Sequence, residues 1–150
     1  MKILVVEDGH EYSELLTRFL GEQFCFQRAG DGFQALELLQ QESWALMFLD
    51  VCFDRIPVER LIGDLNVVSE RFNGCQERGV QHLQAQQGIY ILAEVRKHQF
   101  ALPVLLSKDF IHDMSRWNRL SERYGPIRFL SDNAGPAEMS QCFLEMGRAS

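Results

Sequence analysis

Two continuous apolar runs that end in carboxylates constrain the fold of this chain most strongly. Residues 3–6 lead directly into Glu7 and Asp8. Residues 44–49 lead just as directly into Asp50. An apolar run without polar alternation is typical of a strand buried on both faces, as in a parallel sheet covered by helices. If these two strands are neighbours, their carboxyl ends bring the acidic side chains to one edge of the sheet.

The three carboxylates together predict a cation site. Like charges that lie close together repel one another and raise one another's pKa unless a cation lies among them. Carboxylate oxygens suit a hard divalent ion, and we expect Mg²⁺ at Glu7, Asp8 and Asp50. Acidic residues after a strand also begin loops or cap helices, so each motif alone has a purely structural interpretation. Two such motifs in one small domain favour the metal site.

The remaining pattern alternates between strands and helices. We expect strands at 3–7, 24–26, 44–50, 102–106 and 127–130, and helices at 11–22, 33–41, 89–98, 110–123 and 136–146. This alternation predicts an α/β fold, with a parallel sheet and helices on both faces. The common five-stranded order is 2-1-3-4-5, whose ligand crevice lies at the carboxyl ends of strands one and three. The more polar run at 127–130 indicates a strand near an edge.

Composition predicts an ordinary globular chain. The 150 residues, 46% of them hydrophobic, are enough for a single domain. The net charge of −6 argues against a nucleic-acid-binding surface. No apolar run approaches the roughly 20 residues of a membrane span, and Met1 leads directly into a strand, so we expect a cytoplasmic protein without a signal peptide. The cysteines form no C-x-x-C motif, and Cys75 with His82 is a weak metal-binding pair.

In this order the motifs resemble the receiver domain of bacterial two-component response regulators. The resemblance covers nearly the whole chain, and residues 30–36 look like the start of the family's second helix. It assigns Glu7 and Asp8 to the metal-binding acid pair, Asp50 to the phosphoacceptor, Cys52 to the residue whose backbone carbonyl joins the metal shell, Ser107 to the hydroxyl that follows the phosphoryl group, and Phe129 to the switch aromatic.

The resemblance implies a stand-alone receiver that acts as a phosphorylation-dependent signalling switch. Asp50 would take up a phosphoryl group with the help of Mg²⁺. Ser107 would then bond to that group, and Phe129 would turn inward and alter the surface of the last two strands and helices. The implied partners are a sensor histidine kinase or phosphotransfer protein, a downstream protein target, and a second copy through the last two helices and strand five.

The chain departs from the family near strand five. The family carries a Lys there that pairs with the phosphoryl group, whereas this chain has Asp132. A carboxylate at that position favours a cation and opposes an incoming phosphoryl group. Lys108 is an alternative source of positive charge, although a residue beside Ser107 usually points away. A different alignment places Asp132 on the surface, and both alternatives remain open.

The second departure is an insertion at about 54–87, before the Gly88 that matches the start of the family's third helix. A structureless loop of this length is uncommon in a compact domain. Apolar spacing predicts a helix over 57–72, ended by Asn73-Gly74. Residues 77–87 form either a mobile segment or an extension of the third helix. The insertion is either a lid or partner surface beside the acidic pocket, or a helix that only packs on the domain.

Two other functions compete with the switch. An atypical receiver that binds partners independently of phosphorylation is favoured by Asp132 and by the insertion. A Mg²⁺-dependent phosphatase with an Asp nucleophile usually needs a second Asp two residues later, where this chain has Cys52. The switch is the leading hypothesis, with chemistry limited to self-phosphorylation and autodephosphorylation.

Overall fold

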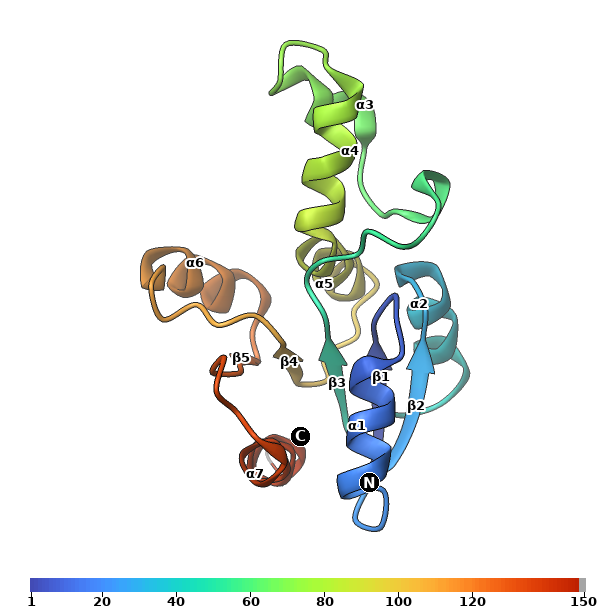
Figure 1. The fold of residues 1–150 in the computed structure, drawn as a ribbon, viewed down its shortest axis with the longest axis vertical. Helices are drawn as coiled ribbons and strands as arrows, with labels where there is room; N and C mark the ends of the chain where they lie inside the picture. The colour runs from blue at the N-terminus through green and yellow to red at the C-terminus, as the bar shows by residue number, and fades with distance from the viewer. Residues whose placement is uncertain (149–150) are drawn as a thin grey trace.

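The computed structural model describes residues 1–148, which form one five-stranded parallel sheet with helices around it (Figure 1). The strand order is β2-β1-β3-β4-β5, so the predicted order is confirmed and β5 lies at an edge. The strands are β1 (Lys2–Val6), β2 (Cys25–Ala29), β3 (Leu46–Leu49), β4 (Val104–Leu106) and β5 (Ile127–Phe129).

Seven α-helices and one 3₁₀ helix connect and follow these strands within residues 1–148. They are α1 (Glu11–Leu20), α2 (Gly32–Gln41), η1 (Val58–Arg60), α3 (Leu65–Glu70), α4 (Gln76–Ala85), α5 (Gln87–Lys97), α6 (Met114–Tyr124) and α7 (Pro136–Arg148). The helix predicted at 110–123 begins later, because Asp113 caps α6 by accepting a hydrogen bond from the Arg116 N–H. None of the helices described here is both long and apolar enough to cross a bilayer.

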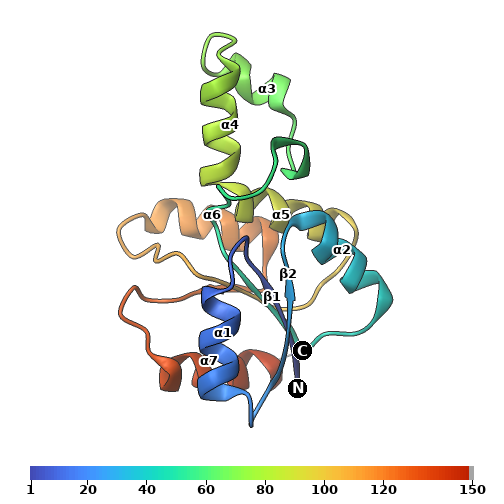
Figure 2. The same ribbon diagram turned by 45° about the vertical axis from the view of Figure 1, so that its right-hand side comes forward.

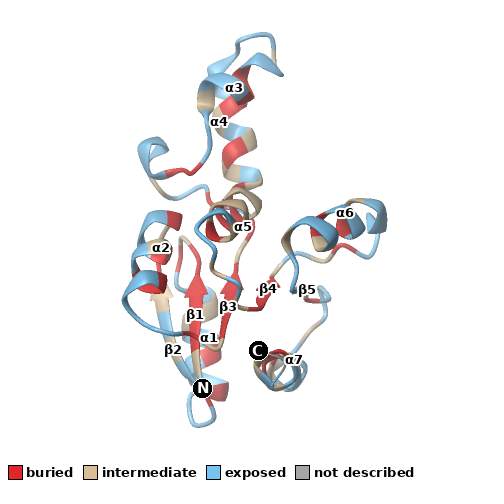
Figure 3. Cartoon of the chain, turned by 180° about the vertical axis from the view of Figure 1, so that it is seen from behind, coloured by how far each residue is buried: buried red, intermediate tan, exposed pale blue. Residues whose placement is uncertain are grey.

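Alternate side chains of the central strands pack into two separate hydrophobic cores, one on each face of the sheet, which explains the unbroken apolar runs. From β1, Leu4 and Val6 join the core under α2, α5 and α6, whereas Ile3 and Val5 join the core under α1 and α7. Every residue of β3 is fully buried, and Figure 3 shows the central strands as the buried centre of the domain. Helices therefore cover both faces, as predicted.

The register of β1 and β3 places their carboxyl ends side by side. The two strands pair in parallel with Val6 opposite Leu49. The Asp50 N–H continues this pairing by donating to the Val6 carbonyl over 2.9 Å. The residues that follow the two strands therefore emerge at the same edge of the sheet.

The insertion contains η1, α3 and α4, which extend beyond the carboxyl edge of the sheet (Figure 2). The single helix predicted over 57–72 is wrong, because Gly63 has a φ of +127° and ends any continuous helix there. Asp64 then begins α3 by accepting hydrogen bonds from the N–H groups of Asn66 and Val67. The second half of the insertion is the helix α4, which meets α5 at Gln86. Residues 77–87 are therefore mostly a helix of their own, and the predicted extension of the third helix is wrong because Gln86 interrupts the helical backbone between α4 and α5.

A buried amide fastens the insertion to α5. Gln87 is fully buried, and its Oε1 accepts a hydrogen bond from the Ile62 N–H over 2.7 Å. Its Nε2 donates to the carbonyls of Ile62 and Leu83, at 3.0 and 3.2 Å. On the surface, the Arg60 guanidinium donates to both carboxylate oxygens of Asp31, at 2.8 and 2.9 Å. This pair is bidentate and the Asp31 side chain is only 14% exposed, so the ion pair and the buried amide both hold the insertion on the domain.

Candidate acidic site at the carboxyl edge

A hollow of about 400 Å³ lies where β1 and β3 end. It is lined by Glu7, Asp8, Glu11, Tyr12, Asp50, Cys52, Asp54 and Arg55. Four of these residues are the predicted metal-site residues Glu7, Asp8, Asp50 and Cys52. Sequence reasoning missed Glu11, Asp54 and Arg55, because no local motif distinguishes them from ordinary surface charges.

Asp50 is held by two hydrogen bonds to one of its oxygens. Its Oδ1 accepts from the Val51 N–H over 2.8 Å and from the Ser107 hydroxyl over 2.8 Å. No residue in the described part of the chain donates to Oδ2. Burial raises the pKa of Asp50, the two hydrogen bonds lower it, and the nearby carboxylates of Asp8 and Glu7 raise it further. The predicted pair of Asp50 and Ser107 is therefore in contact, with one carboxylate oxygen left over.

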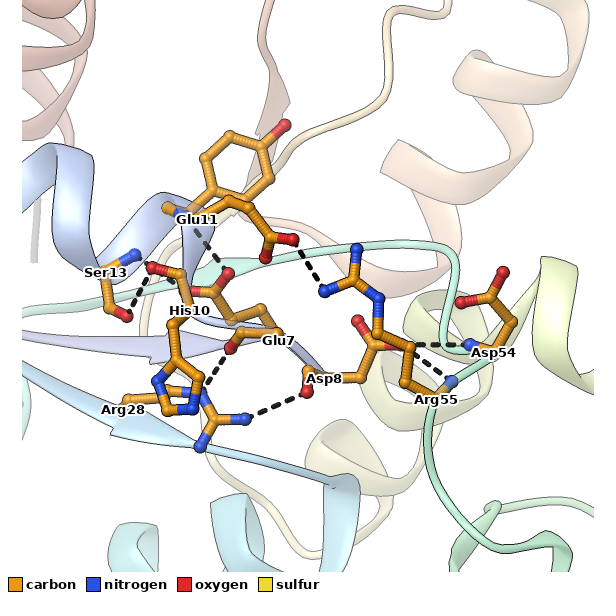
Figure 4. A network of polar contacts seen from close by, with 10 residues as sticks. Glu7, Asp8, His10, Glu11, Ser13, Arg28, Asp54 and Arg55 are labelled. Carbon is orange, nitrogen blue, oxygen red and sulfur yellow. Dashed lines mark hydrogen bonds and ion pairs between the residues drawn. The ribbon is translucent and has the colours of Figure 1, made fainter.

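Glu7 is turned toward the start of α1. Its side chain is 1% exposed, and its Oε1 and Oε2 accept hydrogen bonds from the N–H groups of Tyr12 and Ser13, at 3.0 and 2.6 Å (Figure 4). The first N–H groups of a helix have no partner within the helix, and they carry the positive end of its dipole. The buried charge of Glu7 is thus compensated by α1 itself.

Asp8 links β1 to the first residues of the insertion. Its Oδ2 accepts hydrogen bonds from the N–H groups of Asp54 and Arg55, both at 3.0 Å (Figure 4). The Arg28 guanidinium holds the same turn from β2, donating to the carbonyls of Asp8 and Gly9 at 3.1 and 2.5 Å. Within residues 1–148, no hydrogen bond to the Asp8 Oδ1 is formed. The insertion therefore positions Asp8 and leaves one of its oxygens for another ligand.

The donor set fits a partly hydrated Mg²⁺. No three His, Cys, Asp or Glu side chains within residues 1–148 meet as a ready metal-binding group. Both Glu7 oxygens bond to α1. One oxygen each of Asp8 and Asp50 is left, and Cys52, whose carbonyl the resemblance assigns to the metal shell, lines the same hollow. Mg²⁺ keeps several waters and is usually bound through one or two carboxylates, so this oxygen set suits it.

The two residues considered for charge near the phosphoryl position lie outside the hollow. The Lys108 ammonium lies over the Phe110 ring, 5.4 Å from its centroid. Asp132 is exposed, and its N–H donates to the Asp109 carboxylate over 3.0 Å. Burial raises the pKa of the Tyr12 hydroxyl, and the charge of Asp132 adds to this effect after those of Asp50 and Glu7. Asp132 therefore lies on the surface close to the rim.

The predicted switch aromatic packs against α6. The ring of Phe129 lies edge-on to Trp117 and to Phe110, with centroids 4.8 and 5.8 Å apart. Phe129 is only partly buried. Because Phe110 belongs to the loop between β4 and α6, movement of this loop changes the packing around Phe129.

Gly88 packs against the backbone that follows β3. Its N–H donates to the Val51 carbonyl over 2.9 Å. A Cβ at this position would lie 2.7 Å from the Val51 Cα and closer still to the Asp50 carbonyl oxygen. A glycine is needed here because α5 approaches the Asp50 backbone too closely for any side chain.

Cys75 and His82 do not form a metal pair. The His82 ring packs on Phe72 and Tyr90, with centroids 5.9 and 6.1 Å away, and burial lowers its pKa. Cys75 is an exposed free thiol. Within residues 1–148 no metal-binding group includes either residue.

The sequence matches no protein-family model and no curated protein. Solved structures are nevertheless similar over nearly the whole chain. The Francisella response regulator 1452 receiver domain has a TM-score of 0.66 at 15% identity, over 99% of this chain and 97% of that one. The receiver domain of NtrX from Brucella abortus has a TM-score of 0.65 at 20% identity, over 99% of both chains.

Chemotaxis protein CheY4 from Vibrio cholerae is similar as well. Its TM-score is 0.62 at 16% identity, over 97% of each chain. Identities this low show the fold alone. The chain has the receiver-domain fold, and the predicted resemblance is confirmed at that level.

Proposed function

We propose that this chain is a single receiver-like domain that accepts a phosphoryl group on Asp50 in the presence of Mg²⁺. The observation that carries the proposal is the placement of Asp50. It directly follows β3, accepts a hydrogen bond from Ser107, which directly follows β4, and shares the hollow with Asp8. A receiver-like switch uses this combination of acceptor, hydroxyl and second carboxylate.

The transfer itself is a displacement at phosphorus. The unpaired Oδ2 of Asp50 attacks the phosphorus of an acyl phosphate or a phosphohistidine. The bond from phosphorus to the leaving oxygen or nitrogen breaks, the leaving group keeps the electron pair, and an aspartyl phosphate forms. Mg²⁺ bound by Asp8, Asp50 and the Cys52 carbonyl would neutralise charge on the transferring oxygens. The donor is a sensor histidine kinase or a phosphotransfer protein.

The response passes through Ser107 to the aromatic cluster. When the phosphoryl group is present, the Ser107 hydroxyl exchanges its hydrogen bond to Asp50 for one to a phosphoryl oxygen, which draws the following loop inward. Phe110 belongs to that loop and contacts both Phe129 and Trp117. The altered surface of α6 and β5 is then recognised by a downstream protein target. A homodimer through β5, α6 and α7 stays a prediction.

The test uses Trp117 as a reporter. In a Trp44→Phe background, we expect beryllofluoride with Mg²⁺ to change the Trp117 fluorescence, because the ring contacts Phe129 at 4.8 Å. Acetyl phosphate with Mg²⁺ is expected to add the mass of one phosphoryl group. The matched control Asp50→Asn keeps the size of the side chain and should abolish both responses. Responses that persist in Asp50→Asn would refute the proposal.

A phosphorylation-independent binding module is the second candidate. It is favoured by the carboxylate of Asp132 near the rim, which opposes an anion, and by the insertion packed beside the hollow. Mg²⁺ binding that leaves both phosphoryl probes without effect would support this candidate over the switch.

A further inference from the structure

The hollow around Asp50 has an unusual balance of charge. Five of its eight lining residues are carboxylates, and Arg55 is the one Lys or Arg among them. A phosphoryl group would add between one and two further negative charges. Lys108 is turned onto Phe110, and Asp132 near the rim is itself acidic. Arg55 is therefore the cation that the site offers besides a bound metal ion.

The backbone of Arg55 is held by a hydrogen bond to Asp8, whereas its guanidinium is held by an exposed ion pair. Its backbone N–H donates to Asp8, so its position follows the turn that ends β1. Its Nη1 donates to the Glu11 carboxylate over 2.6 Å, and these two side chains are 57% and 64% exposed (Figure 4). Ion pairs between such exposed side chains are weak, so the guanidinium can change partner at little cost.

We propose that Arg55, which the insertion supplies, exchanges Glu11 for the phosphoryl group on Asp50. This inference rests on the proposed function of Asp50. A phosphoryl group offers more charge than a single carboxylate and three acceptor oxygens, and the planar guanidinium matches two of them at once. The Arg55 backbone stays on Asp8 while its side chain turns into the hollow. The insertion then completes the anion site.

The experiment measures beryllofluoride binding in saturating Mg²⁺, with Trp117 fluorescence in the Trp44→Phe background as the readout. We expect Arg55→Ala to weaken binding about tenfold, because hydrogen bonds to a charged group are lost from a partly exposed site. The beryllofluoride affinity of Arg55→Lys should fall between those of the parent and Arg55→Ala, since lysine keeps the charge but lacks the planar guanidinium that binds two oxygens at once. The matched control is Arg60→Ala, which removes another insertion arginine whose partner is Asp31. It should leave binding unchanged.

Mg²⁺ affinity measured without beryllofluoride separates anion binding from metal binding. Arg55→Ala should bind Mg²⁺ no more weakly than the parent protein, because only a positive charge leaves the hollow. Weaker Mg²⁺ binding that accounts for the whole loss of beryllofluoride affinity would overturn the inference. Thermal unfolding of Arg55→Ala is expected to match the parent, since the exposed side chain contributes little to the fold.

A double-mutant cycle tests the partner exchange itself. Glu11→Gln releases Arg55 and should tighten beryllofluoride binding about threefold. Removing a negative charge helps any anion, so the decisive value is the same change in an Arg55→Ala background. The gain should be smaller there, because only the general effect of the lost negative charge remains. A gain of the same size in both backgrounds, or an Arg55→Ala protein that binds as tightly as the parent, would overturn the Arg55 inference alone. A parent protein without any response dependent on Asp50 would overturn both proposals.

Discussion

Replacement of Gly88 by alanine tests the close contact between α5 and the Asp50 backbone. Helix propensity alone predicts a gain of about 1 kcal/mol for Gly→Ala within a helix. The structure predicts the opposite sign. The new Cβ would lie 2.7 Å from the Val51 Cα and nearer still to the Asp50 carbonyl oxygen, and neither backbone atom can rotate away.

The magnitude follows from these opposing contributions. Overpacking of this kind typically costs about 1–3 kcal/mol. Displacing α5 also strains the 2.9 Å hydrogen bond from the Gly88 N–H to the Val51 carbonyl, which contributes about 1 kcal/mol. After subtracting the gain in propensity, we expect Gly88→Ala to lower the free energy of unfolding by about 2 kcal/mol. For a chain of this size the melting temperature should fall by roughly 4–8 °C.

The assay is urea unfolding followed by circular dichroism, with melting curves alongside. Gly135→Ala is the matched control, because a Cβ at Gly135 meets no atom within 4 Å. That variant should unfold at nearly the same urea concentration as the parent. If Gly88→Ala proves as stable as the parent or more stable, α5 does not press on the Asp50 backbone and the reasoning fails.

Two further predictions concern the buried Gln87 and the partly buried Asp50. Gln87→Leu should destabilise the protein by about 3 kcal/mol, because its three hydrogen bonds to Ile62 and Leu83 contribute about 1 kcal/mol each. Amide hydrogen exchange should then become faster in the insertion than in the sheet. Equal protection of the insertion and the sheet would contradict the anchoring role of Gln87. Burial raises the pKa of Asp50, so its contribution to stability is fully present below the unfolded pKa near 3.8 and is lost as the pH rises through the folded pKa. At pH 7, Asp50→Asn should therefore unfold at a higher urea concentration than the parent. Below pH 4 this advantage should be absent. Equal unfolding midpoints at pH 7 would contradict this prediction.

The sheet could be predicted because its central strands obey a simple physical rule. Residues 3–6 and 46–49 are fully buried between two helical layers, so their sequence carries no polar alternation. The carboxylates that follow these strands mark where burial ends. Parallel pairing then brings Asp8 and Asp50 to one hollow without any knowledge of the loops.

Other features depend on contacts between distant residues, which no local pattern encodes. The apolar spacing over 57–72 continues through Gly63, but the positive φ of that residue and the cap formed by Asp64 divide the segment into η1 and α3. Glu7 reads as a metal ligand in the sequence, yet both of its oxygens bond to the start of α1. Arg55 reads as an ordinary surface residue, although its backbone holds Asp8.

The junction between α4 and α5 gives the insertion a mechanical property. The Phe53 N–H, three residues beyond Asp50, donates to the Gln84 carbonyl at the base of α4 over 2.8 Å. The ten residues of α4 make a helix about 15 Å long, which meets α5 at the non-helical Gln86. A tilt of α4 by about 10° at Gln86 would carry its far end by about 3 Å. If Asp50 accepts a phosphoryl group as proposed, a small shift of the backbone after it would therefore become a larger displacement at the far end of α4.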